Sequence, residues 1–215
     1  MIDELVPPAV VTLGTDRELI ETDLFPEEER ALGRAVEKRR REFVTGRALA
    51  RQALERLGAG AVAVPSGERG EPVWPDGVVG SITHCAAYRA CAVARAGDVA
   101  SVGIDAEVHE RLPDGVYETV SSATERRLLA GQGTGLFMDR VLFSAKEAVY
   151  KAWFPLARRW LGFEDVEMTI DAGAGTFSAR LLVEGPVVAG RRLTELGGRF
   201  RVDGGVVATA VVVGP

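Results

Sequence analysis

The chain has 215 residues, of which 47% are hydrophobic and 27% are charged. This composition is typical of a folded globular protein with one large domain or two small ones. The net charge of -5 gives no general attraction to nucleic acid or to an anionic membrane, so any phosphate recognition has to come from local clusters of basic residues.

The residues that could form a disulfide or a zinc site are few. The chain has two cysteines, Cys85 and Cys91, and two histidines, His84 and His109. This set is small for a zinc site. No basic segment followed by a long apolar stretch lies near Met1, so we expect a reduced cytoplasmic protein. The two cysteines are then expected to be small buried residues, although a pair across neighbouring strands is an alternative.

Residues 1–25 alternate short apolar runs with prolines and acids, and we expect a strand and a loop there. A helical pattern follows from Pro26 to Leu57, because a proline and acids suit its first turn and a glycine comes after it. This predicted helix carries a basic run over residues 38–41 and further arginines after it. The run fits a solvated helix face, and it also fits phosphate capture by guanidinium groups.

Residues 59–77 contain too many glycines and prolines for regular structure, so we expect a shaped loop. Within it, Gly70 would let a ligand approach the backbone, and Pro72 offers a rigid wall. Three strand patterns come next, separated by short turns, and they predict a three-stranded antiparallel meander. The predicted strands cover residues 78–83, 89–94 and 100–107.

The third strand alternates, which puts Asp105 and Glu107 on one face beside Gly103. Two carboxylates held this close repel each other, and a hard divalent cation is a natural partner for them. Two acids on the wet side of an edge strand are the plainer alternative. His84 ends the first strand, where a structural role is the more common one, although Thr83 and His84 can donate to phosphate oxygens.

After residue 108 we expect a crossover, a short helix and a long one. Residues 122–125 form a capping box that opens a helix ending at Gly131. A second helix is predicted from Phe137 to Trp153, stopped by Pro155. Four strand patterns separated by glycine-rich turns complete the chain. They cover residues 166–171, 176–184, 199–202 and 206–213.

The long helix at residues 137–153 is predicted to bury an apolar face and to present Glu147 between Lys146 and Lys151. A surface ion pair between Glu147 and Lys151 is the plain interpretation. However, these are two of only three lysines in a chain with 26 lysines and arginines. Their grouping indicates a site that uses compact ammonium donors.

Taken together, the segments 103–107 and 143–151 resemble the paired signatures of the Sfp-type 4'-phosphopantetheinyl transferases. The segments 70–75 and 80–85, with the basic run near residue 39, resemble the enterobactin-synthase branch and its actinobacterial relatives. The likeness spans residues 30–165.

This resemblance implies an α/β (α+β) fold with two pseudo-twofold subdomains, residues 1–108 and 109–215. Each would be a long helix packed on a small antiparallel sheet, with coenzyme A in the cleft between them. The implied reaction moves the 4'-phosphopantetheine group of coenzyme A to a serine of an apo acyl or peptidyl carrier protein and releases 3',5'-ADP. The alternative function is a module that binds coenzyme A or a nucleotide without transfer, because the arginines and His84 would also serve such a module.

The resemblance also implies residue roles. Asp105, Glu107 and Glu147 would hold Mg²⁺, with Mn²⁺ as a substitute, and Glu147 would deprotonate the serine directly or through water. Lys151 would stabilise the transition state, and Asp105 also belongs to the catalytic set. The residues implied to bind coenzyme A are Arg39, Arg47, Arg69, Gly70, Pro72, Thr83, His84, Lys146 and Lys151.

Two departures from the family pattern are visible. Ser66 stands where some relatives carry a lysine, and Phe143 stands where others have tryptophan. We expect a monomer that binds carrier proteins beside the helix at residues 146–153, without nucleic acid or membrane partners. Polyketide, nonribosomal-peptide and siderophore assembly are the pathways that the branch favours.

Overall fold

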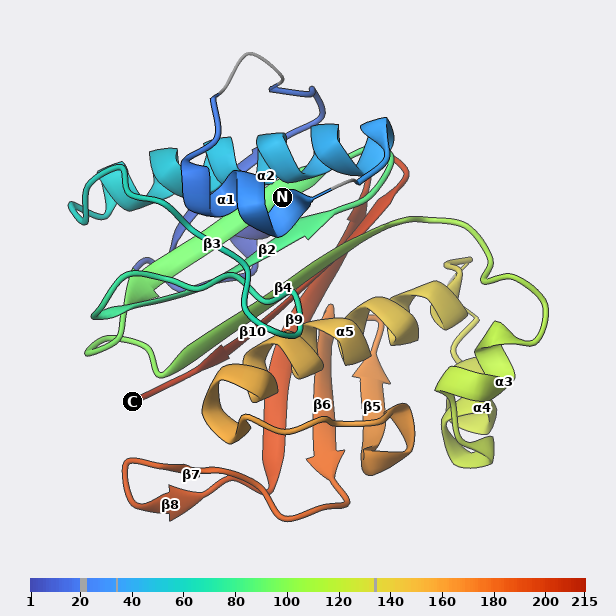
Figure 1. The fold of residues 1–215 in the computed structure, drawn as a ribbon. Coiled ribbons are helices and arrows are strands. Elements are labelled where there is room, and N and C mark those ends of the chain that lie inside the picture. The colour runs from blue at the N-terminus through green and yellow to red at the C-terminus, as the bar shows by residue number, and fades with distance from the viewer. Residues whose placement is uncertain (20–22, 34, 134) are drawn as a thin grey trace.

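The computed structural model describes residues 1–19, 23–33, 35–133 and 135–215 of the chain. The fold is α+β, with helices packed on antiparallel sheets (Figure 1). The helices are α1 Pro26–Leu32, α2 Glu37–Arg56, α3 Val116–Val120, α4 Ala123–Ala130 and α5 Met138–Ala157, with short 3₁₀ turns η1 Ile2–Glu4 and η2 Phe163–Asp165. The strands are β1 Val11–Thr15, β2 Val78–His84, β3 Arg89–Arg95, β4 Ser101–Val108, β5 Val166–Asp171, β6 Thr176–Leu181, β7 Val187–Val188, β8 Arg191–Arg192, β9 Glu195–Asp203 and β10 Val206–Val213.

The N-terminal half packs α2 on a three-stranded antiparallel sheet with the order β1-β3-β2 (Figure 1). Leu49, Ala53 and Leu54 of α2 belong to the same buried cluster as Cys91 and Val93 of β3. The small side chains of β3 let the helix lie close to the sheet, so the sheet and the helix share one apolar core.

The prediction of a single helix from Pro26 to Leu57 is wrong, because the segment forms two helices. Gly33 follows α1 with a φ of 53°, a conformation that glycine adopts without strain and that ends a helix. Residue 34, inside the predicted helix, lies outside the described residues. The next helix, α2, begins at Glu37.

The predicted meander of residues 78–107 is also wrong. β2 and β3 do pair with each other, but the third strand of their sheet is β1, and β4 pairs with β10 instead. The partner of β4 is therefore about 100 residues away in the chain, in the sheet with the order β4-β10-β9-β6-β5. The division into subdomains at residue 108 remains a prediction.

The C-terminal half packs α5 on this five-stranded sheet (Figure 1). Its predicted apolar face is confirmed, and every member of it is fully buried: Val141, Leu142, Ala145, Ala148, Val149, Ala152 and Trp153. Pro155 does not stop the helix, which continues to Ala157 and ends at Arg158 with a φ of 52°. Pro155 lacks only its own N–H donor, and the amide of Arg158 still donates to the carbonyl of Phe154 at 2.9 Å, so the last turn forms.

The two halves meet where β2 lies beside β4. Backbone N–H groups of Ile104 and Ala106 donate to the hydroxyls of Ser81 (3.1 Å) and Thr83 (2.9 Å). These side chains replace the backbone partners that a continuous sheet would supply. The hydroxyls of β2 therefore fix the position of Asp105, which lies between the two bonded residues of β4.

Gly103 permits the contact between β4 and α5. A Cβ atom at this position would overlap the carbonyl oxygen of Ala148 and the amide nitrogen of Ala152. Both are helix backbone atoms, which cannot move independently of the helix.

We therefore expect Gly103→Ala to lower the free energy of unfolding by about 3 kcal/mol, because overpacking forces the helix off the strand. Urea denaturation measures this change. Gly97→Ala is the matched control, since an added Cβ there meets nothing within 4 Å. If Gly103→Ala were as stable as the control, the helix and strand would not be in close contact.

Other local predictions are confirmed. Ser122 and Glu125 form the expected capping box at the start of α4. Cys85 and Cys91 are free thiols, and Cys91 is buried as expected, whereas Cys85 is only half-buried. Predicted strands 166–171 and 206–213 match β5 and β10, whereas β6 ends earlier than expected and β9 is longer. None of the described helices has the length and apolar character needed to cross a membrane.

Candidate active site between the two halves

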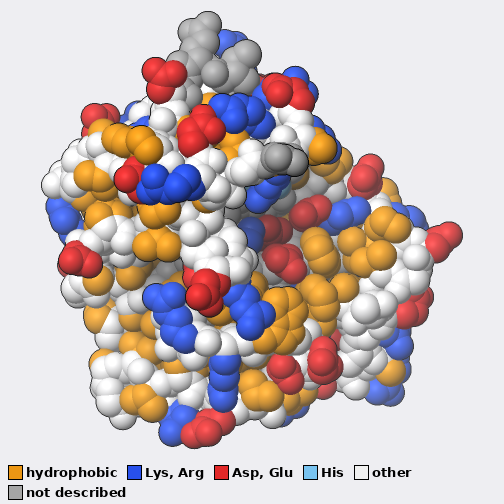
Figure 2. All heavy atoms as spheres, in the orientation of Figure 1, with side chains coloured by type: hydrophobic (Ala, Val, Ile, Leu, Met, Phe, Trp, Pro, Cys, Tyr) orange, Lys and Arg blue, Asp and Glu red, His pale blue; other side chains and the backbone are white. Residues whose placement is uncertain are grey.

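A cavity of about 420 Å³ lies between the N-terminal and C-terminal halves. Figure 2 shows this face, with a hollow near its centre in and around which acidic and basic side chains lie. The loop before β2, strand β2 and the second half of α5 supply its walls. Among the predicted site residues, those that line it are Arg69, Gly70, Pro72, Glu147 and Lys151.

Asp105 and Lys151 form an ion pair beside this cavity. Lys151 Nζ lies 2.7 Å from Asp105 Oδ1 and also donates to the carbonyl of Ile104 at 3.2 Å. The hydroxyl of Thr83 donates to the same Oδ1 atom at 3.2 Å. The structure therefore brings together one residue each from β2, β4 and α5, all three of which the sequence predicted.

The second oxygen of Asp105, Oδ2, is buried and has no hydrogen-bond partner. A buried carboxylate oxygen without a donor is costly, because it has lost water without gaining a replacement. A cation bound at this oxygen would remove that cost. The missing partner of Asp105 Oδ2 is therefore the feature of this structure that best fits a metal ligand.

Glu147 lies one helical turn before Lys151 on α5, on the cavity wall. Burial raises the pKa of its carboxyl group, and nearby Lys151 partly opposes that rise. A carboxylate with a raised pKa is a better proton acceptor than an exposed one. Glu147 is therefore a candidate general base on the wall of the cavity.

Glu107, the other predicted ligand, is held by Arg140 from the first turn of α5. Arg140 Nη1 donates to Glu107 Oε2 at 2.9 Å. Burial raises the pKa of Glu107, the charge on Asp105 raises it further, and Arg140 lowers it. Sequence reasoning missed Arg140, although it stands seven residues before Glu147 and thus on the same side of one helix.

The three acids are not gathered into a preformed metal site. Within the described parts of the chain, no group of three or more histidine, cysteine or acidic side chains is close enough to hold one ion. Lys151 pairs with Asp105, and Arg140 pairs with Glu107. The donor set of carboxylate oxygens nevertheless has the chemistry that Mg²⁺ prefers.

Arg39 and His84 meet at the N-terminal side of the site. Arg39 Nη1 lies 2.7 Å from His84 Nε2. Because arginine can only donate, Nε2 accepts and the ring proton is on Nδ1, which faces Glu42 Oε2 at 3.6 Å. Burial lowers the pKa of His84, which favours this neutral form.

Arg47 is buried, stacks on Phe43 with 4.2 Å to the ring centre, and donates to Ser66 Oγ at 3.0 Å. Burial lowers its pKa to about 10, and its Nε atom has no partner. Ser66 stands where some relatives carry a lysine, and its hydroxyl is therefore held by the hydrogen bond from Arg47. A smaller cavity beside it is lined by Arg39, Phe43, Ser66 and Gly70, so Gly70 borders both cavities. Its φ of 82° is one that glycine alone adopts freely.

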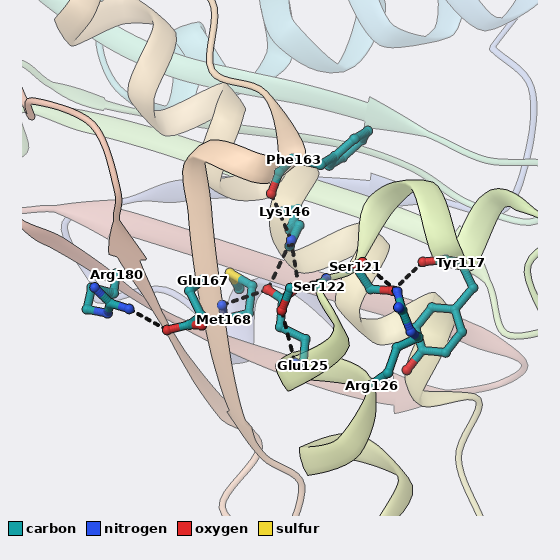
Figure 3. A network of polar contacts seen from close by, with 10 residues as sticks. All are labelled: Tyr117, Ser121, Ser122, Glu125, Arg126, Lys146, Phe163, Glu167, Met168 and Arg180. Atoms are coloured by element: carbon teal, nitrogen blue, oxygen red, sulfur yellow. Dashed lines mark hydrogen bonds and ion pairs between the residues drawn. The ribbon is translucent and has the colours of Figure 1, made fainter.

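The structure places Lys146 elsewhere. Its side chain is buried, and Nζ lies 3.0 Å from both carboxylate oxygens of Glu125. It also donates to the carbonyl of Phe163 at 2.9 Å, and Glu125 accepts from the backbone of Ser122 and Met168 (Figure 3). Lys146 therefore ties α5 to α4 and η2, and it does not line the cavity, contrary to the expectation that both lysines flank Glu147 in the site.

We expect Lys146→Met to lower the free energy of unfolding by about 3–5 kcal/mol, because it leaves the buried Glu125 carboxylate without its cation. Affinity for coenzyme A should not change. Chemical denaturation and calorimetric titration measure the two quantities. The double variant Lys146→Met, Glu125→Gln is expected to recover part of the lost stability, since it removes the unpaired charge. Weaker coenzyme A binding by a folded Lys146→Met variant would instead support a phosphate contact.

Comparison with known proteins identifies the family of this chain. The 4'-phosphopantetheinyl transferase N-terminal domain profile matches residues 27–94, and the 4'-phosphopantetheinyl transferase superfamily profile matches residues 101–195. The chain therefore belongs to the 4'-phosphopantetheinyl transferase family, as the sequence motifs predicted.

Three similar proteins carry that name. 4'-Phosphopantetheinyl transferase Svp of Streptomyces mobaraensis is 54% identical over 193 residues, which is 88% of this chain and 78% of the relative. PptT of Mycobacterium tuberculosis is 49% identical over 194 residues, 88% of this chain and 86% of the relative. Npt of Nocardia iowensis is 46% identical over 219 residues, 98% of this chain and 99% of the relative.

Proposed function

We propose that this chain transfers the 4'-phosphopantetheine group of coenzyme A to a serine hydroxyl of an apo acyl or peptidyl carrier protein. The observation that supports this most directly is the position of Glu147 on the wall of a cavity, one turn from the Lys151–Asp105 pair. In phosphoryl transfer to a hydroxyl, a base accepts the hydroxyl proton and a fixed cation stabilises the negative charge of the transferring group.

In the proposed reaction, Glu147 takes the serine proton, directly or through a water molecule. The serine oxygen then bonds to the phosphorus that carries the pantetheine arm, and the bond from that phosphorus to the departing 3',5'-ADP breaks. Lys151 is positioned to stabilise negative charge on the transferring group, because its ammonium is already oriented by Asp105 and the Ile104 carbonyl.

We propose that Arg39, His84, Arg69 and Arg47 bind the nucleotide end of coenzyme A. Arg39 and His84 are already in contact, so a phosphate could be bound by both. Gly70 and Pro72 would shape the adenine pocket, since both line the larger cavity. Arg47 would contribute through Ser66, to which it donates a hydrogen bond.

Mg²⁺, or Mn²⁺ in its place, would be held by Asp105, Glu107 and Glu147. When bound, such an ion neutralises charge that develops on the pyrophosphate. Oδ2 of Asp105 is the acceptor that this structure leaves free of hydrogen bonds, and Glu107 uses only Oε2 for Arg140. The ligand set follows from the resemblance and from this chemistry.

The test of the proposed reaction is release of 3',5'-ADP from coenzyme A, followed by chromatography. We expect one equivalent per apo carrier protein and none with a carrier whose acceptor serine is replaced by alanine. A protein that only binds coenzyme A would release none with either carrier. We further propose a monomer, because one chain supplies both walls of the cavity. We propose a cytoplasmic location, with which the two free thiols agree.

A further inference from the structure

Arg140 is largely buried, with 10% of its side chain exposed, and its guanidinium group bonds to one short segment. Nη1 donates to Glu107 Oε2 at 2.9 Å, Nε donates to the carbonyl of Glu110 at 3.0 Å, and Nη2 donates to the carbonyl of Arg111 at 3.1 Å. Three of its donors are therefore engaged by the end of β4 and the turn that follows it.

This arrangement fixes the direction of the Glu107 carboxylate. The guanidinium group is planar, and two backbone carbonyls hold its plane, so the remaining donor at Nη1 has a set direction. A charge-assisted hydrogen bond from that donor orients the carboxylate. Arg140 donates to Oε2 of Glu107, and this hydrogen bond leaves Oε1 of the same carboxylate free to bind another group.

Arg140 does not line the cavity, and Glu107 is the proposed site residue that it contacts. Asp105 and Glu107 repel each other across one face of β4, and the charge on Asp105 raises the pKa of Glu107. Arg140 offsets that repulsion. The same helix that carries Glu147 thus also carries the residue that holds a second acid of the site.

We propose that Arg140 is a positioning residue that holds Glu107 in the orientation in which it binds the divalent cation. This inference rests on the proposed metal site of the transferase. It concerns metal affinity and not the binding of coenzyme A, since Arg140 lies outside the cavity. Residues that orient metal ligands typically change metal affinity about 10- to 100-fold when they are replaced.

The experiment is Mn²⁺ titration of the full chain in the presence of coenzyme A, with free Mn²⁺ measured by electron paramagnetic resonance. We expect Arg140→Gln to raise the Mn²⁺ dissociation constant at least about tenfold. Arg140→Lys keeps the charge but lacks the planar fork, so it is expected to weaken Mn²⁺ binding as well. Arg201→Gln is the control, because Arg201 is an exposed arginine that pairs with Glu4, and its dissociation constant should match that of the unchanged chain.

A double-mutant cycle separates positioning from a general structural effect. In a Glu107→Gln chain, Arg140→Gln should cause no further loss of Mn²⁺ affinity, and in the otherwise unchanged chain the KM for coenzyme A at saturating metal should stay the same. Unaltered Mn²⁺ affinity in a folded Arg140→Gln or Arg140→Lys variant would overturn the inference, as would a further loss in the Glu107→Gln chain. If the unchanged chain failed to bind Mn²⁺ at all, the proposed metal site would be refuted first and the role of Arg140 with it.

Discussion

Glu147→Gln is expected to lower kcat for carrier modification about 10²- to 10⁴-fold, the range over which a general base acts. Glutamine has nearly the same size and cannot accept the serine proton. Coenzyme A should still bind, because the basic residues at the nucleotide end are unchanged. Steady-state kinetics with an apo carrier and calorimetric titration with coenzyme A measure the two effects.

Stability provides an internal check on this variant. A carboxyl group whose pKa is raised by burial destabilises the fold at any pH at which it is ionised. Glu147→Gln should therefore unfold at the same temperature as the unchanged chain or higher. Glu55→Gln, at an exposed position on α2, is the control and should retain full activity. A Glu147→Gln variant with normal kcat would rule out Glu147 as the base.

Asp105→Asn is the second substitution for which we expect a large effect. It removes the carboxylate that holds Lys151 at 2.7 Å and the Oδ2 acceptor proposed for the metal. A loss of about 3 kcal/mol of transition-state stabilisation would reduce kcat/KM about 100-fold. The amide can still accept the hydrogen bond from Thr83, so the contact between β2 and β4 is expected to persist.

Chelation separates the metal role of Asp105 from its ion pair. If Asp105 acts through the cation, then a chelator should reduce the unchanged chain to the activity of Asp105→Asn and should reduce the variant little further. Asp203→Asn, at an exposed residue at the end of β9, is the control and should respond to the chelator as the unchanged chain does. Full activity of Asp105→Asn in the presence of the chelator would contradict the metal proposal.

The fold was predictable where the pattern was local. The burial of one face of α5, the capping box at Ser122 and the limits of β5 and β10 all follow from residues close together in the chain. The pairing of β4 did not, because short turns favour a hairpin and nothing in strand periodicity identifies the partner. The valine-rich strand β10 competes for the same edge from 100 residues away and forms the ladder instead.

The candidate site was predictable in the same partial way. Lys151 stands four residues after Glu147, on the same face of a helix, and both line the cavity. The ion pair of Lys151 with Asp105 was not predicted. Lys146 stands next to Glu147, which is a rotation of 100° around the helix axis, and its partner Glu125 comes from a separate helix. No sequence pattern reveals that partner, so the adjacent lysine could be assigned to the site only by resemblance.

The most direct test of the proposed transferase activity is the intact mass of an apo carrier protein after incubation with this chain, coenzyme A and Mg²⁺. We expect the carrier to gain the mass of one phosphopantetheine group, and to gain none when Glu147→Gln replaces the unchanged chain. An unaltered mass across apo acyl and peptidyl carriers, with the enzyme folded and metal present, would contradict the proposed function.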